Sequence, residues 1–243
     1  MTISNPTLIV TGASRGIGRA IALLAIQNLG TNVIGVARSK QALQDLSNHI
    51  ENDLQLKDCF KFVSWGGRLD GLVINAGVLD PIVPIATANL KDWKHNFDVN
   101  FFSVITFVQH ALPALRNSKG RVIFVSSGAA VHAYHGWGAY CASKAALNMF
   151  GKSLATEEPE VTSISVDPGV VDTEMQAVIR REGAAGMVPT QHSQFVELHA
   201  SKQLLHPDQP GHVIASLAVK APLSLSGKFI PWNDDELLSH RKP

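Results

Sequence analysis

The strongest constraint on this chain is an alternation of short apolar runs with longer segments of helical periodicity. Most of the short runs are apolar on both faces, which is typical of strands buried on both faces of a parallel sheet. Strand alternating with helix predicts an α/β fold built on a doubly wound sheet. The predicted strands are residues 7–10, 32–36, 60–63, 72–74, 121–125 and 162–166, and the predicted helices are 19–29, 40–52, 90–116 and 139–156.

Length and composition fit one globular unit. The 243 residues are 45% hydrophobic and 17% charged, and their net charge of +1 gives no bias toward nucleic acid or an anionic membrane. No repeat, low-complexity tract or Pro/Gly linker divides the chain, so we expect a single domain over residues 1–243. Residues 172–209 look less regular, and we expect a lid or substrate loop there, with a surface insertion as the alternative.

The sequence also bears on location and metal binding. No apolar run approaches the roughly 18 residues that span a bilayer, and the start MTISNPTLIV lacks the basic region and cleavage site of a secretory signal. We therefore expect a cytoplasmic protein with Cys59 and Cys141 as reduced thiols. His132 and His135 have no cysteine or carboxylate cluster at ligand spacing beside them, so no metal site is expected.

A glycine-rich turn, TGASRGIG at residues 11–18, directly follows the first predicted strand and opens the first helix. Gly12, Gly16 and Gly18 let the backbone turn sharply and approach a ligand closely. The helix N-terminus beyond them offers free N–H groups and a partial positive charge to a pyrophosphate. The spacing is not GxGxxG, but the mechanics predict the same dinucleotide binding.

Two arginines favour NADP(H) over NAD(H). In NAD-binding proteins an Asp or Glu about 20 residues beyond the glycines holds the ribose 2′-hydroxyl, whereas Ala37 and Arg38 stand at that place here. Arg38, together with Arg15 inside the glycine turn, would pair with a 2′-phosphate. The alternative is that both are ordinary surface arginines.

The stretch GWGAYCASKAAL, residues 136–147, places Tyr140 and Lys144 four positions apart on one face of a predicted helix. Taken alone, the pair fits an ordinary, partly exposed helix. An unperturbed tyrosine has a pKa of about 10, too high for free proton exchange near neutrality. A neighbouring ammonium stabilises the phenolate, so we expect Lys144 to lower the pKa of Tyr140 and form an acid–base unit with it.

Six motifs occur in order along the chain: the glycine turn, INAG (74–77), DVN (98–100), VSS (125–127), YCASK (140–144) and DPGVVDT (167–173). This series resembles the short-chain dehydrogenase/reductase family over nearly the whole chain. The resemblance implies a Rossmann-type seven-stranded sheet and an oxidoreductase that uses NADP(H) on CH–OH or C=O groups of a small-molecule carbonyl substrate. It also implies a homodimer or homotetramer, with the helices that begin near residues 90 and 139 forming the dimer face.

The resemblance further implies roles for single residues. Tyr140 would be the proton donor and acceptor, and Lys144 would lower its pKa and hold the nicotinamide ribose. Ser127 would orient the carbonyl, and Asn100 would anchor a water chain for proton supply. The residues implied for cofactor binding are Gly12, Ser14, Arg15, Gly16, Ile17, Gly18, Arg38, Asn75, Ala76, Gly77, Tyr140, Lys144, Pro168, Gly169, Val171 and Thr173.

Within the family, the motifs are nearest to sepiapterin reductases and fungal benzil-type reductases, which reduce one carbonyl of a vicinal dicarbonyl with NADPH. Pro231 stands where sepiapterin reductases carry an acidic residue on the last strand, and Asp234 and Asp235 lie beyond it. We therefore expect an aromatic or aliphatic diketone rather than a pterin. The alternatives are an alcohol or steroid dehydrogenase working in the oxidative direction, and a cofactor-binding protein with little turnover.

Three further side chains are candidates for the substrate pocket, or are ordinary packing: Trp137, His135 and Met175.

The connection between the third and fourth predicted strands is unusually short. Eight residues separate Val63 from Leu72, whereas parallel crossovers normally need about a dozen. This connection also lacks the aspartate that contacts adenine in the short-chain dehydrogenase/reductase family. Either residues 60–63 are not the regular third strand, or the chain is a shortened variant with weakened adenine binding, or a segment is absent from the sequence.

Overall fold

The computed structural model describes residues 5–56, 59–61 and 68–241. They form a seven-stranded sheet in the order β3-β2-β1-β4-β5-β6-β7, in which every neighbouring pair of strands is parallel. The predicted doubly wound fold is thereby confirmed. The strands are β1 (Thr7–Thr11), β2 (Asn32–Val36), β3 (Phe60–Lys61), β4 (Gly71–Ile74), β5 (Arg121–Val125), β6 (Thr162–Asp167) and β7 (Phe229–Pro231).

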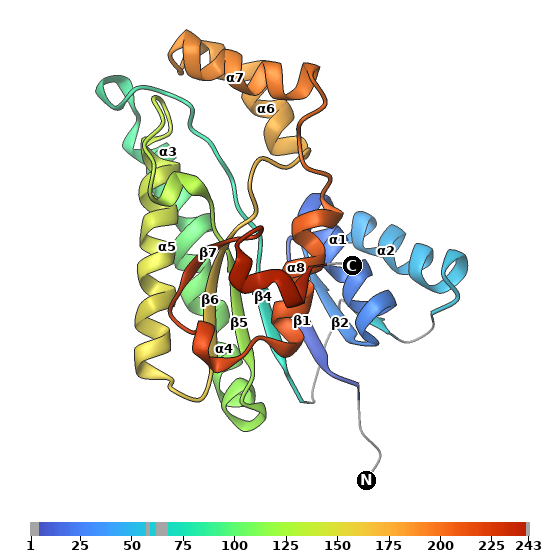
Figure 1. The fold of residues 1–243 in the computed structure, drawn as a ribbon. Coiled ribbons are helices and arrows are strands. Elements are labelled where there is room, and N and C mark those ends of the chain that lie inside the picture. The colour runs from blue at the N-terminus through green and yellow to red at the C-terminus, as the bar shows by residue number, and fades with distance from the viewer. Residues whose placement is uncertain (1–4, 57–58, 62–67, 242–243) are drawn as a thin grey trace.

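Helices cover both faces of the sheet (Figure 1). On one side lie α1 (Gly16–Leu29), α2 (Lys40–Asn48) and α8 (Asp208–Lys220), and on the other lie α3 (Leu90–Phe97), α4 (Ser103–Ser118) and α5 (Gly138–Glu157). Two more helices, α6 (Glu174–Glu182) and α7 (Pro189–Ala200), stand above one end of the sheet. None of the helices in the described part of the chain is long and apolar enough to cross a membrane.

The strands carry apolar residues on both faces because each face of the sheet packs on its own core. In β5, Val122 and Phe124 belong to the cluster formed with α4 and α5, whereas Ile123 and Val125 belong to the cluster formed with α1 and α8. Successive side chains of a strand point to opposite faces. Because both faces are buried, the strand sequences lack the alternation of apolar and polar residues that a sheet with one exposed face would show.

The predicted strands match the observed ones to within one residue at each described end, but three helical predictions need correction. The first helix begins at Gly16, three residues earlier than expected, because Arg15 is its extended N-cap residue. The segment 90–116 is interrupted by a π-helical turn, Asp98–Phe102, between α3 and α4. The segment 172–209 is largely regular, since α6 and α7 occupy most of it, and Pro189 supports the start of α7 at its first turn.

The short third strand can now be placed. Phe60 and Lys61 pair in parallel with Val33 and Ile34 of β2, at the edge of the sheet. The reading in which residues 60–63 are not the regular third strand is therefore wrong. Val63 and most of the short connection, residues 62–67, lie outside the described residues, so the other two readings stay open.

The described end of that connection is tied to the start of β1. The carboxylate of Asp70 accepts a hydrogen bond from the Thr7 backbone N–H at 2.9 Å and an ion-paired one from Arg68 Nε at 2.7 Å. These contacts fix the entry into β4, which pairs with β1 from Leu8 onward.

Candidate active site

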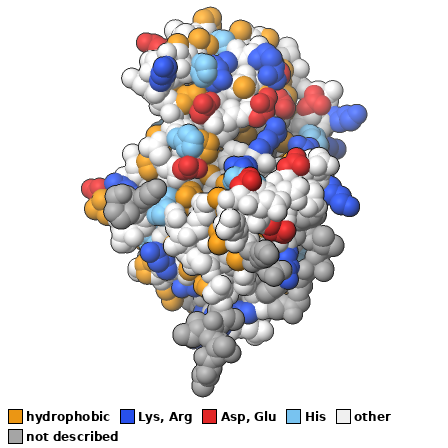
Figure 2. All heavy atoms as spheres, turned by 90° about the vertical axis from the view of Figure 1, so that its right-hand side faces the viewer, with side chains coloured by type: hydrophobic (Ala, Val, Ile, Leu, Met, Phe, Trp, Pro, Cys, Tyr) orange, Lys and Arg blue, Asp and Glu red, His pale blue; other side chains and the backbone are white. Residues whose placement is uncertain are grey.

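A large cavity lies at the carboxyl end of the sheet, where the strand order reverses between β1 and β4. Parallel α/β sheets bind ligands at such a switch point because the loops leave the neighbouring strands in opposite directions there. The cavity has a volume of about 1330 Å³ and is lined by the ends of β1, β2, β4, β5 and β6, with α6 and α7 above it. Figure 2 shows charged side chains gathered in the upper half of one face, toward these two helices.

The glycine turn forms the floor of the cavity at its β1 end. Gly12 and Gly16 adopt φ values of +68° and +54°, in the left-handed region that favours glycine. A side chain on Gly12 would come within 2.7 Å of Asn75 Nδ2, so the turn also needs the missing Cβ. Arg15 makes no side-chain hydrogen bond as the N-cap of α1, so the first N–H groups of the helix are available to an anion.

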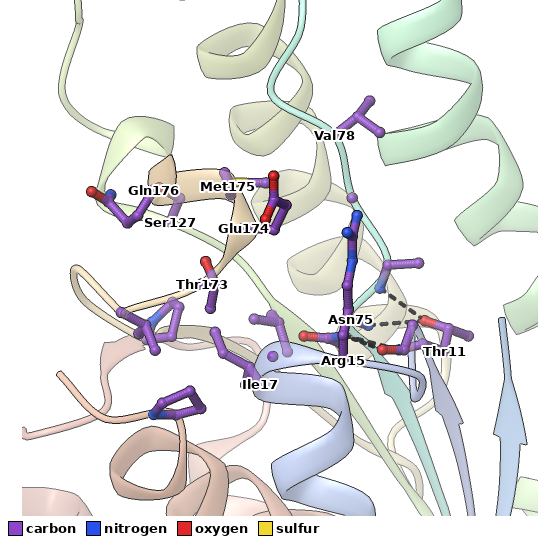
Figure 3. A pocket seen from close by; sticks show the side chains of 18 of the residues that line it. Thr11, Arg15, Ile17, Asn75, Val78, Ser127, Thr173, Glu174, Met175 and Gln176 are labelled. Atoms are coloured by element: carbon purple, nitrogen blue, oxygen red, sulfur yellow. Dashed lines mark hydrogen bonds between the residues drawn. The ribbon is translucent and has the colours of Figure 1, made fainter. Parts of the chain in front are cut away.

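The INAG segment is fastened to the end of β1. The Thr11 hydroxyl oxygen accepts hydrogen bonds from the backbone N–H groups of Asn75 at 2.9 Å and Ala76 at 3.1 Å. In return, Asn75 Nδ2 donates to the Thr11 carbonyl at 3.0 Å (Figure 3). These bonds hold Asn75, Ala76 and Gly77 in the cavity wall, where the sequence predicted them.

Gly18 and Ala13 are the residues of the glycine turn that do not line the cavity. A Cβ on Gly18 would lie 2.3 Å from the Gly12 carbonyl oxygen. The contact of Gly18 with a cofactor stays a prediction. The absent side chain of Gly18 lets α1 pack closely against the turn, and this supports the binding residues indirectly.

Exposed arginines surround the far end of the cavity. Arg15 and Arg38 both line it, and within the described residues neither forms an ion pair with a carboxylate. Arg19, one turn into α1, lines the same end and was missed from the sequence. The spacing from Arg15 to Arg19 on one helical face was the signal that could have found it. The arrangement suits an anionic group bound near the end of β2.

The nicotinamide-side residues of the prediction also line the cavity. Pro168, Gly169, Val171 and Thr173 follow β6 and lead into α6, with Gly169 at φ +73°. A parallel bridge between Val171 and Leu205 holds this loop against the segment that leads into α8. Ser14 and Ile17 line the cavity from the opposite side. The loop after β6 and the glycine turn thus face one another across the space.

Tyr140, Lys144 and Ser127 meet at the inner end of the cavity. Tyr140 and Lys144 are only 5% and 4% exposed, and the lysine Nζ lies 5.7 Å from the centroid of the tyrosine ring. The same Nζ donates a hydrogen bond to the Val125 carbonyl at 2.9 Å. Ser127, two residues after β5, lies close enough to the Tyr140 hydroxyl to lower the pKa of the tyrosine. The sequence-predicted trio is therefore brought together by α5 and the end of β5.

The electrostatics of this trio differ from the prediction. Burial raises the pKa of Tyr140 to about 12, which outweighs the lowering by the Ser127 hydroxyl, and the Asp167 carboxylate raises it further. Burial also lowers the pKa of Lys144 to about 8. The net shift of the Tyr140 pKa is therefore upward and not downward as expected, because desolvation dominates both groups. They hold the phenol in its protonated, proton-donating form.

Asn100 lies one layer behind the cavity wall, in the π-helical turn between α3 and α4. Its Oδ1 accepts from the Val78 N–H at 2.8 Å, and its Nδ2 donates to the Val78 carbonyl at 2.8 Å and to Ser143 Oγ at 3.1 Å. It is 1% exposed and does not line the cavity. π-Turns are frequent at functional sites because the extra residue redirects a side chain. Here the π-turn directs the Asn100 side-chain amide to the backbone after β4 and to α5, the helix that carries Tyr140.

An aromatic stack closes the inner end of the cavity. The Trp137 ring stacks against Tyr134, at a centroid distance of 4.6 Å, and against Phe195 of α7, at 5.3 Å, and Tyr134 and Phe195 are themselves 6.1 Å apart, so the three rings contact one another. It also meets the Tyr140 ring edge-on at 5.9 Å. Tyr134 and Phe195 line the cavity with Trp137 and were missed, because single aromatics far apart in the sequence carry no periodic signal.

Of the three pocket candidates, two are placed correctly and one is not. Trp137 and Met175 line the cavity. His135 does not, because its ring Nδ1 lies 2.8 Å from the Gly186 carbonyl and its backbone N–H donates to Gln191, away from the cavity.

The residues on and after β7 stand apart from the cavity. Pro231, Asp234 and Asp235 are absent from its wall, and Asp234 instead caps the following 3₁₀ segment through the Glu236 N–H at 2.9 Å. No acidic residue of β7 therefore reaches the substrate end. No cluster of three or more His, Cys, Asp or Glu side chains that could hold a metal ion occurs among residues 5–56, 59–61 and 68–241.

Comparison with known proteins places this site in a family. The family model for short chain dehydrogenases matches residues 6–184. This chain belongs to the short-chain dehydrogenase family. The resemblance read from the six motifs is thereby confirmed.

Individual relatives agree over nearly the full length. The chain is 40% identical to a benzil reductase ((S)-benzoin forming) of Saccharomyces cerevisiae, with 95% of this chain and 97% of the relative covered. It is 31% identical to the sepiapterin reductase of Rattus norvegicus, with 81% and 85% covered. A solved short chain dehydrogenase/reductase from Saccharomyces cerevisiae superposes with a TM-score of 0.91 at 37% identity, covering 98% of this chain and all of the other.

Proposed function

We propose that this protein is an NADPH-dependent carbonyl reductase that acts on a ketone, with a vicinal dicarbonyl as its substrate class. The observation that carries the proposal is the buried Tyr140, which lies at the end of a large cavity and is held protonated beside Ser127 and Lys144. A neutral phenol with a raised pKa is a proton donor, which is what the oxygen of a carbonyl under reduction needs. We propose further that residues 1–243 act as one domain, with residues 172–209 covering the substrate.

The cofactor is proposed from the residues of the cavity. The glycine turn and the first turn of α1 would receive a pyrophosphate, and Asn75, Ala76 and Gly77 would flank the adenosine side. Arg15 and Arg38, exposed and without carboxylate partners in the described part of the chain, fit the 2′-phosphate of NADP(H). Such a dinucleotide supplies a hydride for the carbonyl carbon.

The remaining chemistry belongs to the side chains of the chain. The Ser127 hydroxyl, next to Tyr140, would donate a hydrogen bond to the carbonyl oxygen as negative charge develops on it. Tyr140 would then give its proton to that oxygen. The Lys144 ammonium, held by the Val125 carbonyl, stabilises the phenolate that is left, and Asn100 keeps the backbone beside it in place.

The substrate class follows from the wall of the cavity and from the relatives. The stack of Tyr134, Trp137 and Phe195 offers flat apolar surfaces to an aryl group next to the carbonyl. A relative with 40% identity is named for reducing benzil. The position of Pro231, Asp234 and Asp235 outside the cavity argues against a pterin held by an acidic residue on or after the last strand, β7.

The test is NADPH oxidation, followed by absorbance, against a panel of diketones, pterins and ketosteroids. We expect the fastest turnover with an aryl diketone. Tyr140→Phe should lower kcat by at least about 1,000-fold while NADPH still binds, because only the transferable proton is lost. Tyr134→Phe is the matched control, since it keeps the ring in the stack, and should stay within about tenfold of wild type.

The alternatives have distinct outcomes in the same assay. Full activity of Tyr140→Phe removes this residue from the reaction. Tight NADPH binding without oxidation by any carbonyl of the panel favours a binding protein. Faster oxidation of an alcohol or steroid with NADP⁺ than reduction of any ketone favours a dehydrogenase of the oxidative direction.

A further inference from the structure

Gln176, in the first turns of α6, is an unusual residue to find facing the substrate end of the cavity. It is 7% exposed and lines the cavity, and its Oε1 is fully buried without a hydrogen-bond partner among the described residues. It lines the cavity together with Ser127 (Figure 3), and Met175 and Ile179 of the same helix pack in the apolar cluster that contains Tyr140 and Trp137. A buried carboxamide with an unpaired end costs free energy, so its presence calls for a partner that a ligand can supply.

The position of Gln176 on α6 is one that packing alone would fill with an apolar side chain. Ile179, three residues later on the same helical face, is 2% exposed and belongs to the apolar cluster that contains Trp137 and Phe195. Glu174 also lines the cavity, but it is exposed, whereas Gln176 is buried. Gln176 is therefore the buried polar residue of the inward face of α6.

The cavity wall has one other buried polar atom without a partner in the described part of the chain, and it lies in the aromatic stack. The indole Nε1 of Trp137 donates to nothing, although the residue is 5% exposed. Two unpaired polar groups in the walls of one end of the cavity mark that end as a place for a ligand with polar atoms of its own.

We propose that Gln176 is a specificity-determining residue that binds the second carbonyl oxygen of a vicinal dicarbonyl while Ser127 and Tyr140 bind the first. This inference rests on the proposed function. Bond lengths place the two oxygens of such a substrate roughly 3–4 Å apart, so the second oxygen lies beside the reacting one, within the cavity that Gln176 lines together with Ser127 and Tyr140. The carboxamide can present either N–H₂ or C=O to the cavity, and its N–H₂ would donate to this acceptor.

The proposal explains selectivity as well as binding. A buried amide left without its partner penalises any substrate that lacks the matching group, and such sites discriminate more strongly than purely apolar pockets do. A ketone with CH₂ in place of the second carbonyl would leave Gln176 unpaired, although its aryl groups still fit the aromatic stack.

The experiment compares benzil with deoxybenzoin, in which one carbonyl of benzil is replaced by CH₂. For Gln176→Leu we expect kcat/KM for benzil to fall about 10- to 100-fold, while kcat/KM for deoxybenzoin changes less than about threefold. Gln176→Glu, which keeps the size but removes the N–H₂ donors, should give the same selective loss. Gln194→Leu, the same change at an exposed position of α7, is the matched control and should leave both values unchanged.

Several outcomes overturn the proposal. Equal losses on the two substrates would show that Gln176 acts through the fold of α6, and an unchanged benzil rate would show that it does not bind the second oxygen. Calorimetric titration of each ketone into the NADP⁺ complex of each variant gives a readout that does not depend on turnover. If the wild type reduces neither ketone, the proposed function fails, and the titration still decides whether Gln176 prefers the dicarbonyl.

Discussion

Lys144 offers the sharpest test of how burial sets the properties of this site. Its pKa falls from 10.5 to about 8 because α5 holds its ammonium out of water. A shift of about 2.5 units corresponds to roughly 3 kcal/mol of folding free energy lost at pH 7, at about 1.36 kcal/mol per unit. Between pH 8 and 10.5 the unfolded chain binds a proton at this lysine that the folded chain has released, so this cost disappears as the pH rises.

The expected change can be worked out for an accessible pH range. For the lysine pKa values of about 8 and 10.5, raising the pH from 7 to 9 returns about 1 kcal/mol of stability to the wild type. Tyr140 contributes little in this window, because its folded pKa of about 12 and its ordinary value near 10 both lie above it. In Lys144→Met this gain is absent, so the two proteins should differ by about 1 kcal/mol in how their stability changes with pH.

The assay is urea unfolding at pH 7 and pH 9, followed by tryptophan fluorescence, for wild type and Lys144→Met. The loss of the bond to the Val125 carbonyl destabilises the variant equally at both pH values and cancels in the comparison. Lys152→Met, at an exposed position of the same helix, is the control and should keep the wild-type pH dependence. If Lys144→Met shows the same pH dependence as the wild type, the ammonium is not desolvated and the reasoning is refuted.

Three further predictions concern the cofactor end and the support of the site. Arg38→Asp should weaken NADPH binding about 100-fold and leave NADH binding within about fivefold, because a carboxylate repels the 2′-phosphate; fluorescence titration measures both, and equal losses would contradict the assignment. Gly18→Ala should weaken both dinucleotides alike, because its Cβ would lie 2.3 Å from the Gly12 carbonyl oxygen. Gly30→Ala, which meets nothing within 4 Å but has φ +60°, should only lower the stability by about 1 kcal/mol. Asn100→Ala should destabilise the protein by about 2–4 kcal/mol, because the Val78 groups and Ser143 lose their buried partner; an unchanged thermal midpoint would show that the network is not needed.

The sheet was readable from the sequence because its strands are buried on both faces. In β5, Arg121 to Val125, the apolar side chains point alternately into the two hydrophobic cores. The result is a short, nearly continuous apolar run, which is typical of a strand buried on both faces. The glycine turn was readable for a similar reason, since φ values near +60° at Gly12 and Gly16 admit few other residues.

The helices above the cavity, α6 and α7, could not be predicted from the sequence in the same way. α7 buries only Phe195 along its 12 residues, so its sequence has no apolar stripe to mark it as a helix. Gln176 and Ile179 are the buried residues of α6, and a buried glutamine breaks the pattern that would identify the inward face. His135 was misplaced for a related reason, because a histidine near a motif carries no sign of which way its ring will turn.

The sequence by itself determined which elements form, the order of the family motifs, and the spacing that puts Tyr140 and Lys144 on one face of α5. Only the tertiary structure decided that Asn100 supports the site from behind, that Gln176 lines the same cavity as Ser127, and that Tyr140 has a raised rather than a lowered pKa. The physical reason is that helices, strands and turns depend on neighbours along the chain. The charge state of a side chain depends on how much water the whole fold leaves around it, and residues far apart in the sequence set that amount.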